Sequence, residues 1–131
     1  MNNDITLKEL KKSKEKLLPE IKCLEENQLT FLWFDDFYDG PLNGVLKYQD
    51  KEYKYEIVSD YMKLEYPRIF AVVALTNEEL KEEKYWNDLY KELVKNQSEK
   101  EESLEAFFEQ QKKRKVINYG NRKVLWCYVS S

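Results

Sequence analysis

Apolar and polar residues recur with a helical spacing near the beginning of the chain. Thr6 and Glu9 have the form of a capping box, in which a hydroxyl begins a helix and a glutamate three residues later returns to it. Four leucines between residues 7 and 18 follow at roughly helical spacing, and Pro19 ends or kinks the segment. Lysines cover most other positions. The pattern predicts a basic amphipathic helix that docks on a sheet rather than on a membrane.

Two continuous apolar stretches predict strands. Residues 29–34 form a short, continuous stretch rich in aromatic side chains, which is typical of a strand buried on both faces. Residues 68–75 are apolar after Arg68, which predicts a central strand. Between them, residues 35–44 are acidic and contain two of the three glycines, so we expect a turn-rich connection there.

Alternation with a period of two predicts a hairpin in the middle of the chain. Residues 45–48 have the pattern of an extended segment, residues 49–51 of a turn, and residues 52–58 of a second strand. Three apolar side chains beginning with Tyr53 share one face of this second strand, and charged side chains share the other. We therefore expect the second strand to contact water on one side.

The second half of the chain predicts two more helices and a late strand. Thr76 and Glu79 form a second capping box, and an apolar helical face continues to about Asn96. A further helix begins at Ser98 and ends in a basic run, residues 112–115, which suits the helix dipole. A turn and an alternating apolar stretch then close the sequence as a hairpin or as one late strand.

The order of these elements predicts the fold class. It favours an α+β fold, with an antiparallel or mixed sheet of about five strands packed by about three helices. The chain has no internal repeat and no linker, so we expect residues 1–131 to form a single α+β domain. A chain of 131 residues is long enough for a real hydrophobic core.

Composition excludes several classes of protein. Apolar residues make up 42% and charged residues 36%, with few glycines and prolines, which excludes a disordered or low-complexity chain. The absence of histidine removes the commonest general base, the serine–histidine and cysteine–histidine nucleophile pairs, and imidazole zinc sites. We therefore expect no catalytic residues, no metal and no cofactor.

The cysteines and the start of the chain indicate the compartment. Cys23 and Cys127 are far apart among apolar neighbours and make no disulfide framework, so we expect two buried thiols. No run of about 18 apolar residues exists, and the N-terminus lacks a basic start followed by an apolar stretch. These observations predict a soluble protein of the reducing cytoplasm with no membrane partner.

The acidic connection at residues 35–44 is the first candidate site. Asp35, Asp36 and Asp39, with Tyr38 among them, could meet a basic partner or hold Mg²⁺ or Ca²⁺. The regular ligand spacing of a calcium loop is absent. Turn chemistry alone also accounts for these residue types.

A nuclease-like pattern overlaps this region. Asp39 followed by Glu52, Tyr53 and Lys54 resembles the Asp…Glu-x-Lys core of restriction-type nucleases. In that core two carboxylates hold Mg²⁺ and the lysine assists the attacking water. Glu-x-Lys recurs elsewhere in this Glu- and Lys-rich chain, so chance also produces the pattern.

A basic cluster near the end of the chain is the second candidate site. Six cations between residues 112 and 123 have no acid between them, and a tyrosine lies among them, which suits phosphate and base contacts. The candidate ligand-binding residues are Arg114, Lys115, Tyr119, Arg122 and Lys123. The net charge of −3 disfavours nucleic acid, and a helix end followed by a charged hairpin also explains the cluster.

Residues 37–44 carry a resemblance to known proteins. Phe-Tyr-Asp-Gly-Pro-Leu-Asn-Gly is similar to a Tyr-Asp-Gly-Pro-Leu-x-Gly element of small uncharacterised bacterial and phage proteins. There it precedes a hairpin with an aromatic second strand, here around Tyr53, and later a helix beginning near a Tyr-Trp pair, here Tyr85-Trp86. The resemblance covers residues 29–95 and implies a recurring domain without catalytic residues. In composition the chain is also similar to immunity proteins and phage-encoded inhibitors.

These observations give three functional hypotheses. The first is a non-enzymatic binding protein, an immunity-type protein or phage-encoded inhibitor that docks on a bacterial protein. Its partner-binding residues are Asp35, Asp36, Tyr38, Asp39, Glu52 and Glu56. The second is a protein that sequesters a small nucleotide with the basic cluster, and the third is a Mg²⁺-dependent nuclease. A tyrosine-rich strand would also fit a homodimer, and nucleic acid is not the expected partner.

Overall fold

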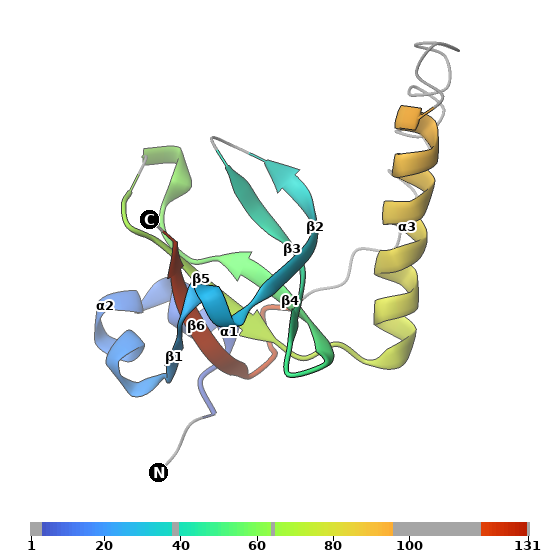
Figure 1. Cartoon of the computed structure of the whole chain (residues 1–131). Coiled ribbons are helices and arrows are strands. Elements are labelled where there is room, and N and C mark those ends of the chain that lie inside the picture. The colour runs from blue at the N-terminus through green and yellow to red at the C-terminus, as the bar shows by residue number, and fades with distance from the viewer. Residues whose placement is uncertain (1–3, 38–39, 64, 96–118, 131) are drawn as a thin grey trace. The chain divides into compact units, whose positions relative to one another are not determined.

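The computed structural model describes residues 4–37, 40–63, 65–95 and 119–130 (Figure 1). The chain divides into two compact units, residues 1–75 with 119–131 and residues 76–118. The first unit contains a sheet and the second contains one long described helix. That the whole chain forms one domain stays a prediction.

The first unit is built on a six-stranded sheet. Its strands are β1 (Cys23–Leu24), β2 (Thr30–Phe37), β3 (Pro41–Tyr48), β4 (Lys51–Ile57), β5 (Arg68–Val73) and β6 (Val124–Ser130). They lie in the order β1-β6-β5-β4-β3-β2, and neighbouring strands are antiparallel except β1 and β6, which run parallel. This mixed sheet with its helices confirms the predicted α+β class, with six strands where about five were expected.

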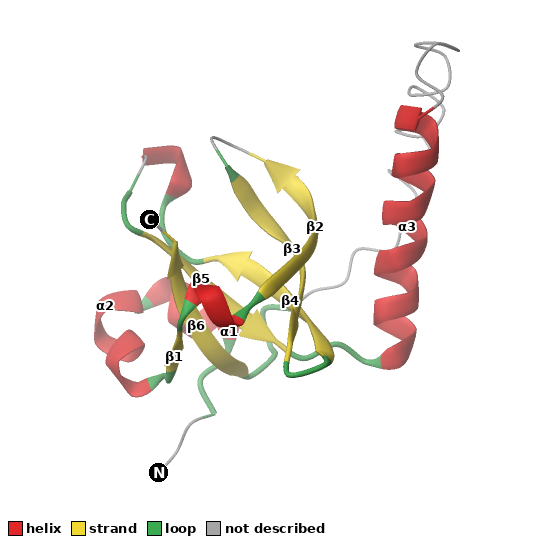
Figure 2. Cartoon of the chain, viewed as in Figure 1, coloured by secondary structure: helices red, strands yellow, loops and turns green. Residues whose placement is uncertain are grey.

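The sheet curls so strongly that its two edges approach each other (Figure 2). β1 and β2 are at opposite edges, yet only residues 25–29 connect them, including the 3₁₀ helix η2 (Glu26–Gln28). Such a connection reaches roughly 20 Å at most, whereas a flat sheet of six strands is about 24 Å wide. Phe31 of β2 and Tyr128 of β6 accordingly have ring centroids 5.5 Å apart. The fold is therefore a partly closed barrel.

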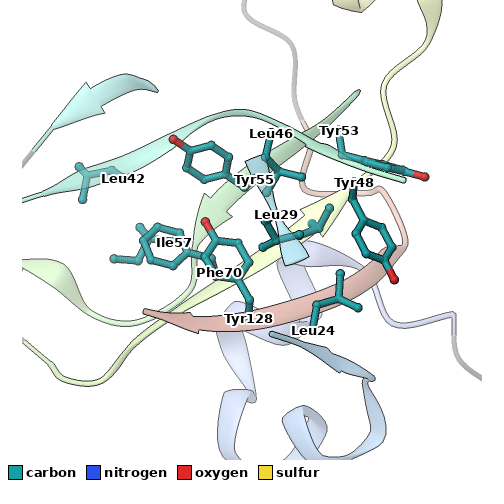
Figure 3. Packing of buried hydrophobic residues seen from close by; sticks show 11 residues of the cluster. Leu24, Leu29, Leu42, Leu46, Tyr48, Tyr53, Tyr55, Ile57, Phe70 and Tyr128 are labelled. Atoms are coloured by element: carbon teal, nitrogen blue, oxygen red, sulfur yellow. The ribbon is translucent and has the colours of Figure 1, made fainter. Parts of the chain in front are cut away.

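The concave face of the curled sheet holds the main hydrophobic core (Figure 3). Its buried members are Leu24, Leu29, Leu42, Leu46, Tyr48, Tyr53, Tyr55, Ile57, Phe70, Val72 and Tyr128. Phe70 and Tyr128 stack with centroids 5.0 Å apart. Burial raises the pKa values of Tyr55 and Tyr128, so both phenols stay neutral. The Tyr55 hydroxyl donates to the Trp33 carbonyl oxygen, 3.2 Å away.

The N-terminal helix begins as predicted. In α1 (Leu7–Lys12) the Thr6 hydroxyl accepts from the Glu9 N–H, and the Glu9 carboxylate accepts from the Thr6 N–H, which confirms the capping box. The Thr6 N–H and the Thr6 hydroxyl both donate to the Glu9 carboxylate, and these two hydrogen bonds lower its pKa. Leu7 and Leu10 are buried, so the apolar stripe of the helix docks on the sheet.

The expected continuous helix is split after two turns. Ser13 has φ −131° and ψ 47°, outside the helical region, and α2 (Lys14–Leu17) and the 3₁₀ helix η1 (Leu18–Glu20) follow it. A serine side chain competes for backbone hydrogen bonds and favours such interruptions. Pro19 lies within η1, which is the last helical turn of this segment.

α1 lies on the convex face of the sheet. Its Lys11 forms an ion pair with Glu56 of β4. Glu56 alternates with the core residues Tyr55 and Ile57, so its side chain points to the opposite face. The barrel therefore has a concave aromatic core and a convex face that carries the helix and the charged side chains of β4.

The two central hairpins differ in how well the sequence predicts them. Between β3 and β4, Gln49 and Asp50 have φ of 50° and 64°, the signature of a two-residue type I′ loop, which confirms the predicted turn. Between β2 and β3 the predicted connection at residues 35–44 is wrong. β2 continues to Phe37 and β3 begins at Pro41, because backbone pairing between the strands extends almost to the tip of the hairpin.

Burial along the strands corrects one prediction and confirms another. β2 was expected to be buried on both faces, but Phe31, Leu32 and Phe34 are 43%, 36% and 51% exposed because β2 is an edge strand. β5 lies between β4 and β6 and is buried along most of its length, which confirms a central strand. The predicted strand near the end of the sequence is confirmed by β6.

The second unit contains α3 (Asn77–Lys95). The Glu79 N–H donates to the Thr76 hydroxyl at 3.1 Å, and the Thr76 N–H donates to the Glu79 carboxylate at 2.9 Å, which confirms the second capping box. The helix expected from Ser98 and the basic run at residues 112–115 lie outside the described residues. Over the described ranges, no helix is long and apolar enough to cross a membrane.

Candidate functional site

The acidic candidates lie largely in β2 and β4. Asp35 is in β2 and reaches across β3 to Lys54 of β4, with 2.8 Å between the carboxylate oxygen and Lys54 Nζ. The β2–β3 register shifts between Phe34 and Asp36, which makes a bulge at Asp35. The Lys54 residue is only 6% exposed, so its ammonium group is largely withdrawn from water, while Asp35 stays partly exposed.

The other acidic candidates are less concentrated than the sequence indicates. The backbone of Asp36 pairs with Asn43, while Tyr38 and Asp39 lie outside the described residues. Glu52 is half-buried and shares the convex face of β4 with Glu56, whose carboxylate is held by the ion pair to α1. The structure therefore places Asp35, Glu52 and Glu56 on one face and two of them in ion pairs.

The basic candidates are partly structural. Tyr119 is buried, and the Arg122 guanidinium lies 5.0 Å from its ring centroid while donating to the Ala74 carbonyl oxygen at 2.9 Å. Lys123 lies 3.7 Å from a carboxylate oxygen of Asp4. Arg114 and Lys115 lie outside the described residues. The buried ring of Tyr119 already has a cation against it, which disfavours the stacking role expected from the sequence.

The two predicted sites meet at one polar cluster on the convex face. Lys54 Nζ lies 5.5 Å from the Tyr119 ring centroid, so Asp35, Lys54, Tyr119 and Arg122 form a continuous chain of charge and ring contacts. We call these four residues the Lys54 cluster. It joins β2, β4 and the segment that leads into β6. These contacts give Asp35, Tyr119 and Arg122 a structural role, because they connect segments that are far apart in the sequence.

An exposed apolar strip runs along β2. It consists of Phe31, Leu32 and Phe34, and we call it the β2 strip. Phe31 also touches the core, with its ring centroid 5.5 Å from that of Tyr55. Among the described residues β2 pairs only with β3, so the backbone groups of its outer edge meet no other strand there.

Sequence reasoning missed the β2 strip because it took the segment for an interior strand. The signal that was available is the pair Asp35 and Asp36 at the end of the strand. Acidic residues inside a strand are typical of edges, where charge opposes unwanted pairing. An interior strand buried on both faces would exclude two consecutive carboxylates.

A small groove lies beside β6. It has a volume of about 260 Å³ and is lined by Glu20, Ile21, Lys22, Lys123, Val124, Leu125 and Trp126. Among the described residues of the predicted basic cluster, Lys123 lines it. The lining therefore includes two lysines and a tryptophan.

Metal-binding chemistry finds no support in the part of the chain that the structure describes. No group of three or more Asp, Glu and Cys side chains there is arranged to hold a metal ion. The nuclease-like pattern requires Asp39, which lies outside the described residues, and Lys54 is engaged with Asp35. The nuclease stays a prediction.

No protein family model, no curated protein and no solved structure matches the chain. The resemblance of residues 37–44 to small bacterial and phage proteins therefore stays a prediction. Both glycines of that segment have structural reasons, since Gly40 has φ +127° and Gly44 lies against the backbone of β2.

Proposed function

We propose that the protein is a non-enzymatic binding protein of the immunity or inhibitor type, which docks on a bacterial protein through the outer edge of β2. The observation that carries the proposal is the β2 strip, three large apolar side chains that are exposed along an edge strand. The bulge at Asp35 and the acidic residues Asp35 and Asp36 oppose unselective pairing at this edge, so a partner strand must be complementary in charge. An exposed apolar edge is also the surface to which an extended segment of another protein adds as a further strand.

Covering this strip would contribute part of the binding free energy. Fully burying an exposed phenylalanine contributes about 1.5 to 3 kcal/mol. Phe31 and Phe34 are 43% and 51% exposed, so covering the exposed part of each would contribute up to about half of that amount. Phe31 is supported from beneath by Tyr55 and Tyr128, which makes it a rigid anchor rather than a mobile side chain.

Charge defines the chemistry of the partner. Residues 29–40 contain three aspartates and neither lysine nor arginine. Lys54 pairs with Asp35, and Asp36 and Asp39 add negative charge to the same stretch of the sequence. The proposed occupant is therefore an extended segment of a basic protein, in which apolar side chains alternate with lysine or arginine. Tyr38, which lies outside the described residues, remains part of the proposed surface.

The substitution Phe34→Asp is expected to weaken partner binding by about thirtyfold or more, the effect of losing a central apolar anchor. The protein captured from host lysate by the native chain would be identified and its affinity for each variant measured by biolayer interferometry. Met62→Asp is the matched control, because Met62 is 66% exposed and belongs to another element, the 3₁₀ helix η3 (Tyr61–Lys63). Equal losses in both variants would contradict docking at β2, provided circular dichroism shows both folded.

The groove beside β6 supports a second candidate function, binding of a small anionic ligand such as a nucleotide. Lys22 and Lys123 would contact phosphate, and Trp126 would contact the base. The volume of about 260 Å³ is below the usual range of ligand pockets, which is why this function ranks second. Native mass spectrometry of freshly purified protein tests it, since a bound ligand lost with Lys123→Glu would favour the groove.

A further inference from the structure

The fold brings the two cysteines of the chain together. Cys23 in β1 and Cys127 in β6 are far apart in the sequence, yet they are register partners in the parallel pair of strands. The N–H of Cys127 donates to the carbonyl oxygen of Lys22 at 3.0 Å, which fixes this register. The sequence predicted two separate buried thiols, and that prediction is wrong for Cys23, which is exposed at the edge of the sheet.

Both thiols lie on the same face of the sheet. The next register pair, Leu24 and Tyr128, belongs to the core on the concave face. Side chains alternate along each strand, so Cys23 and Cys127 both point to the convex face. Neighbouring strands are about 4.8 Å apart, which lies within the Cα separations of about 4.4 to 6.8 Å that disulfides span.

The two thiols differ in access and in acidity. Cys127 is completely buried, and burial raises the pKa of its thiol to about 12. Cys23 is exposed and is therefore the thiol that reaches a dissolved oxidant. Of the two, β1 is the element that can adjust, because it is a two-residue strand at the edge of the sheet, whereas β6 is held on both sides.

We propose that Cys23 and Cys127 form a reversible intramolecular disulfide by exchange with a low-molecular-weight disulfide such as oxidised glutathione. The Cys23 thiolate attacks one sulfur of glutathione disulfide, forms a mixed disulfide and releases the first glutathione thiolate. Cys127 then gives up its proton and attacks the Cys23 sulfur, which releases the second glutathione. Two protein thiols are oxidised to one disulfide, and one glutathione disulfide is reduced to two thiols.

The exposure of Cys23 predicts a labile bond, because exposed disulfides are easier to reduce than buried structural ones. The bond would fasten β1 to β6 just before the connection that leads into β2.

The test is incubation of the full chain with oxidised glutathione at mildly alkaline pH, followed by alkylation and mass spectrometry. The native chain is expected to lose both free thiols, to carry no glutathione, and to yield one cross-linked peptide joining Cys23 to Cys127. Reduced glutathione in excess is expected to restore both thiols. A native chain that keeps a stable mixed disulfide at Cys23, or links two copies through it, would overturn the proposal.

Two variants distinguish the first step, the attack of Cys23 on glutathione disulfide, from the second step, the attack of Cys127 on the mixed disulfide. Cys127→Ala, which retains a small apolar side chain in the buried position, is expected to stop at one glutathione on Cys23. Cys23→Ser is expected to remain unmodified under the same conditions because Cys127 is buried. Rapid modification of Cys127 in folded Cys23→Ser would contradict the proposed order of attack.

Discussion

Replacing Gly44 with alanine is expected to lower the free energy of unfolding by about 3 kcal/mol or more, because the position has no room for a methyl group. A Cβ atom there would lie 2.6 Å from Phe34 Cα and 2.8 Å from the Tyr55 hydroxyl, and still nearer to the Trp33 carbonyl oxygen. Two of these neighbours are backbone atoms of β2, so only separation of β2 from β3 relieves the clash. Urea unfolding followed by tryptophan fluorescence measures the change.

Gly40→Ala is the comparison that isolates this effect. Gly40 has φ +127°, which strains any other residue, and among the described residues its added Cβ would meet the end of the Arg68 side chain, at 3.1 Å. A strained backbone position costs about 1 to 2 kcal/mol. The account therefore predicts a clearly smaller loss at Gly40 than at Gly44, and equal losses would mean that β2 does not approach β3 as described.

Lys54→Met is expected to destabilise the protein by about 3 kcal/mol, the lower end of the range for breaking a buried ion pair. The substitution leaves the carboxylate of Asp35, whose side chain is 21% exposed, without the ammonium group 2.8 Å away. It also removes the cation that lies over the Tyr119 ring. The methionine keeps most of the length and apolar volume, so lost charge rather than a cavity causes the change.

Two controls test the origin of that loss. In the double variant with Asp35→Asn, stability is expected to recover in part, because no uncompensated carboxylate remains. Lys63→Met breaks a pair with Asp60 whose lysine side chain is 85% exposed, and a change below about 1 kcal/mol is expected. A loss at Lys63 as large as at Lys54 would contradict the structural role of the Lys54 cluster.

The features that the sequence predicted well are those fixed by neighbouring residues. The Thr6 and Thr76 capping boxes and the Gln49–Asp50 turn each depend on a few consecutive positions, and all three are present. β5 was also predicted, because a short, continuous apolar stretch is typical of a strand that is buried on both faces in the interior of a sheet.

The features that the sequence did not predict depend on pairing between distant segments. β1 has two residues and becomes a strand only because Cys23 and Leu24 meet β6. The exposure of β2 follows from its place at the edge of the sheet, which periodicity alone does not encode. Lys54 appeared only in the nuclease-like pattern, because its partner Asp35 lies on another strand.

Hydrogen–deuterium exchange of the chain, alone and bound to the protein that Phe34→Asp fails to capture, tests docking at β2 most directly. The account predicts that amides of residues 29–37 become protected in the complex, because the partner strand satisfies the outer edge of β2. Residues 20–22 and 123–126 around the groove should exchange as before. Protection confined to the groove, with β2 unchanged, would contradict docking at the β2 edge.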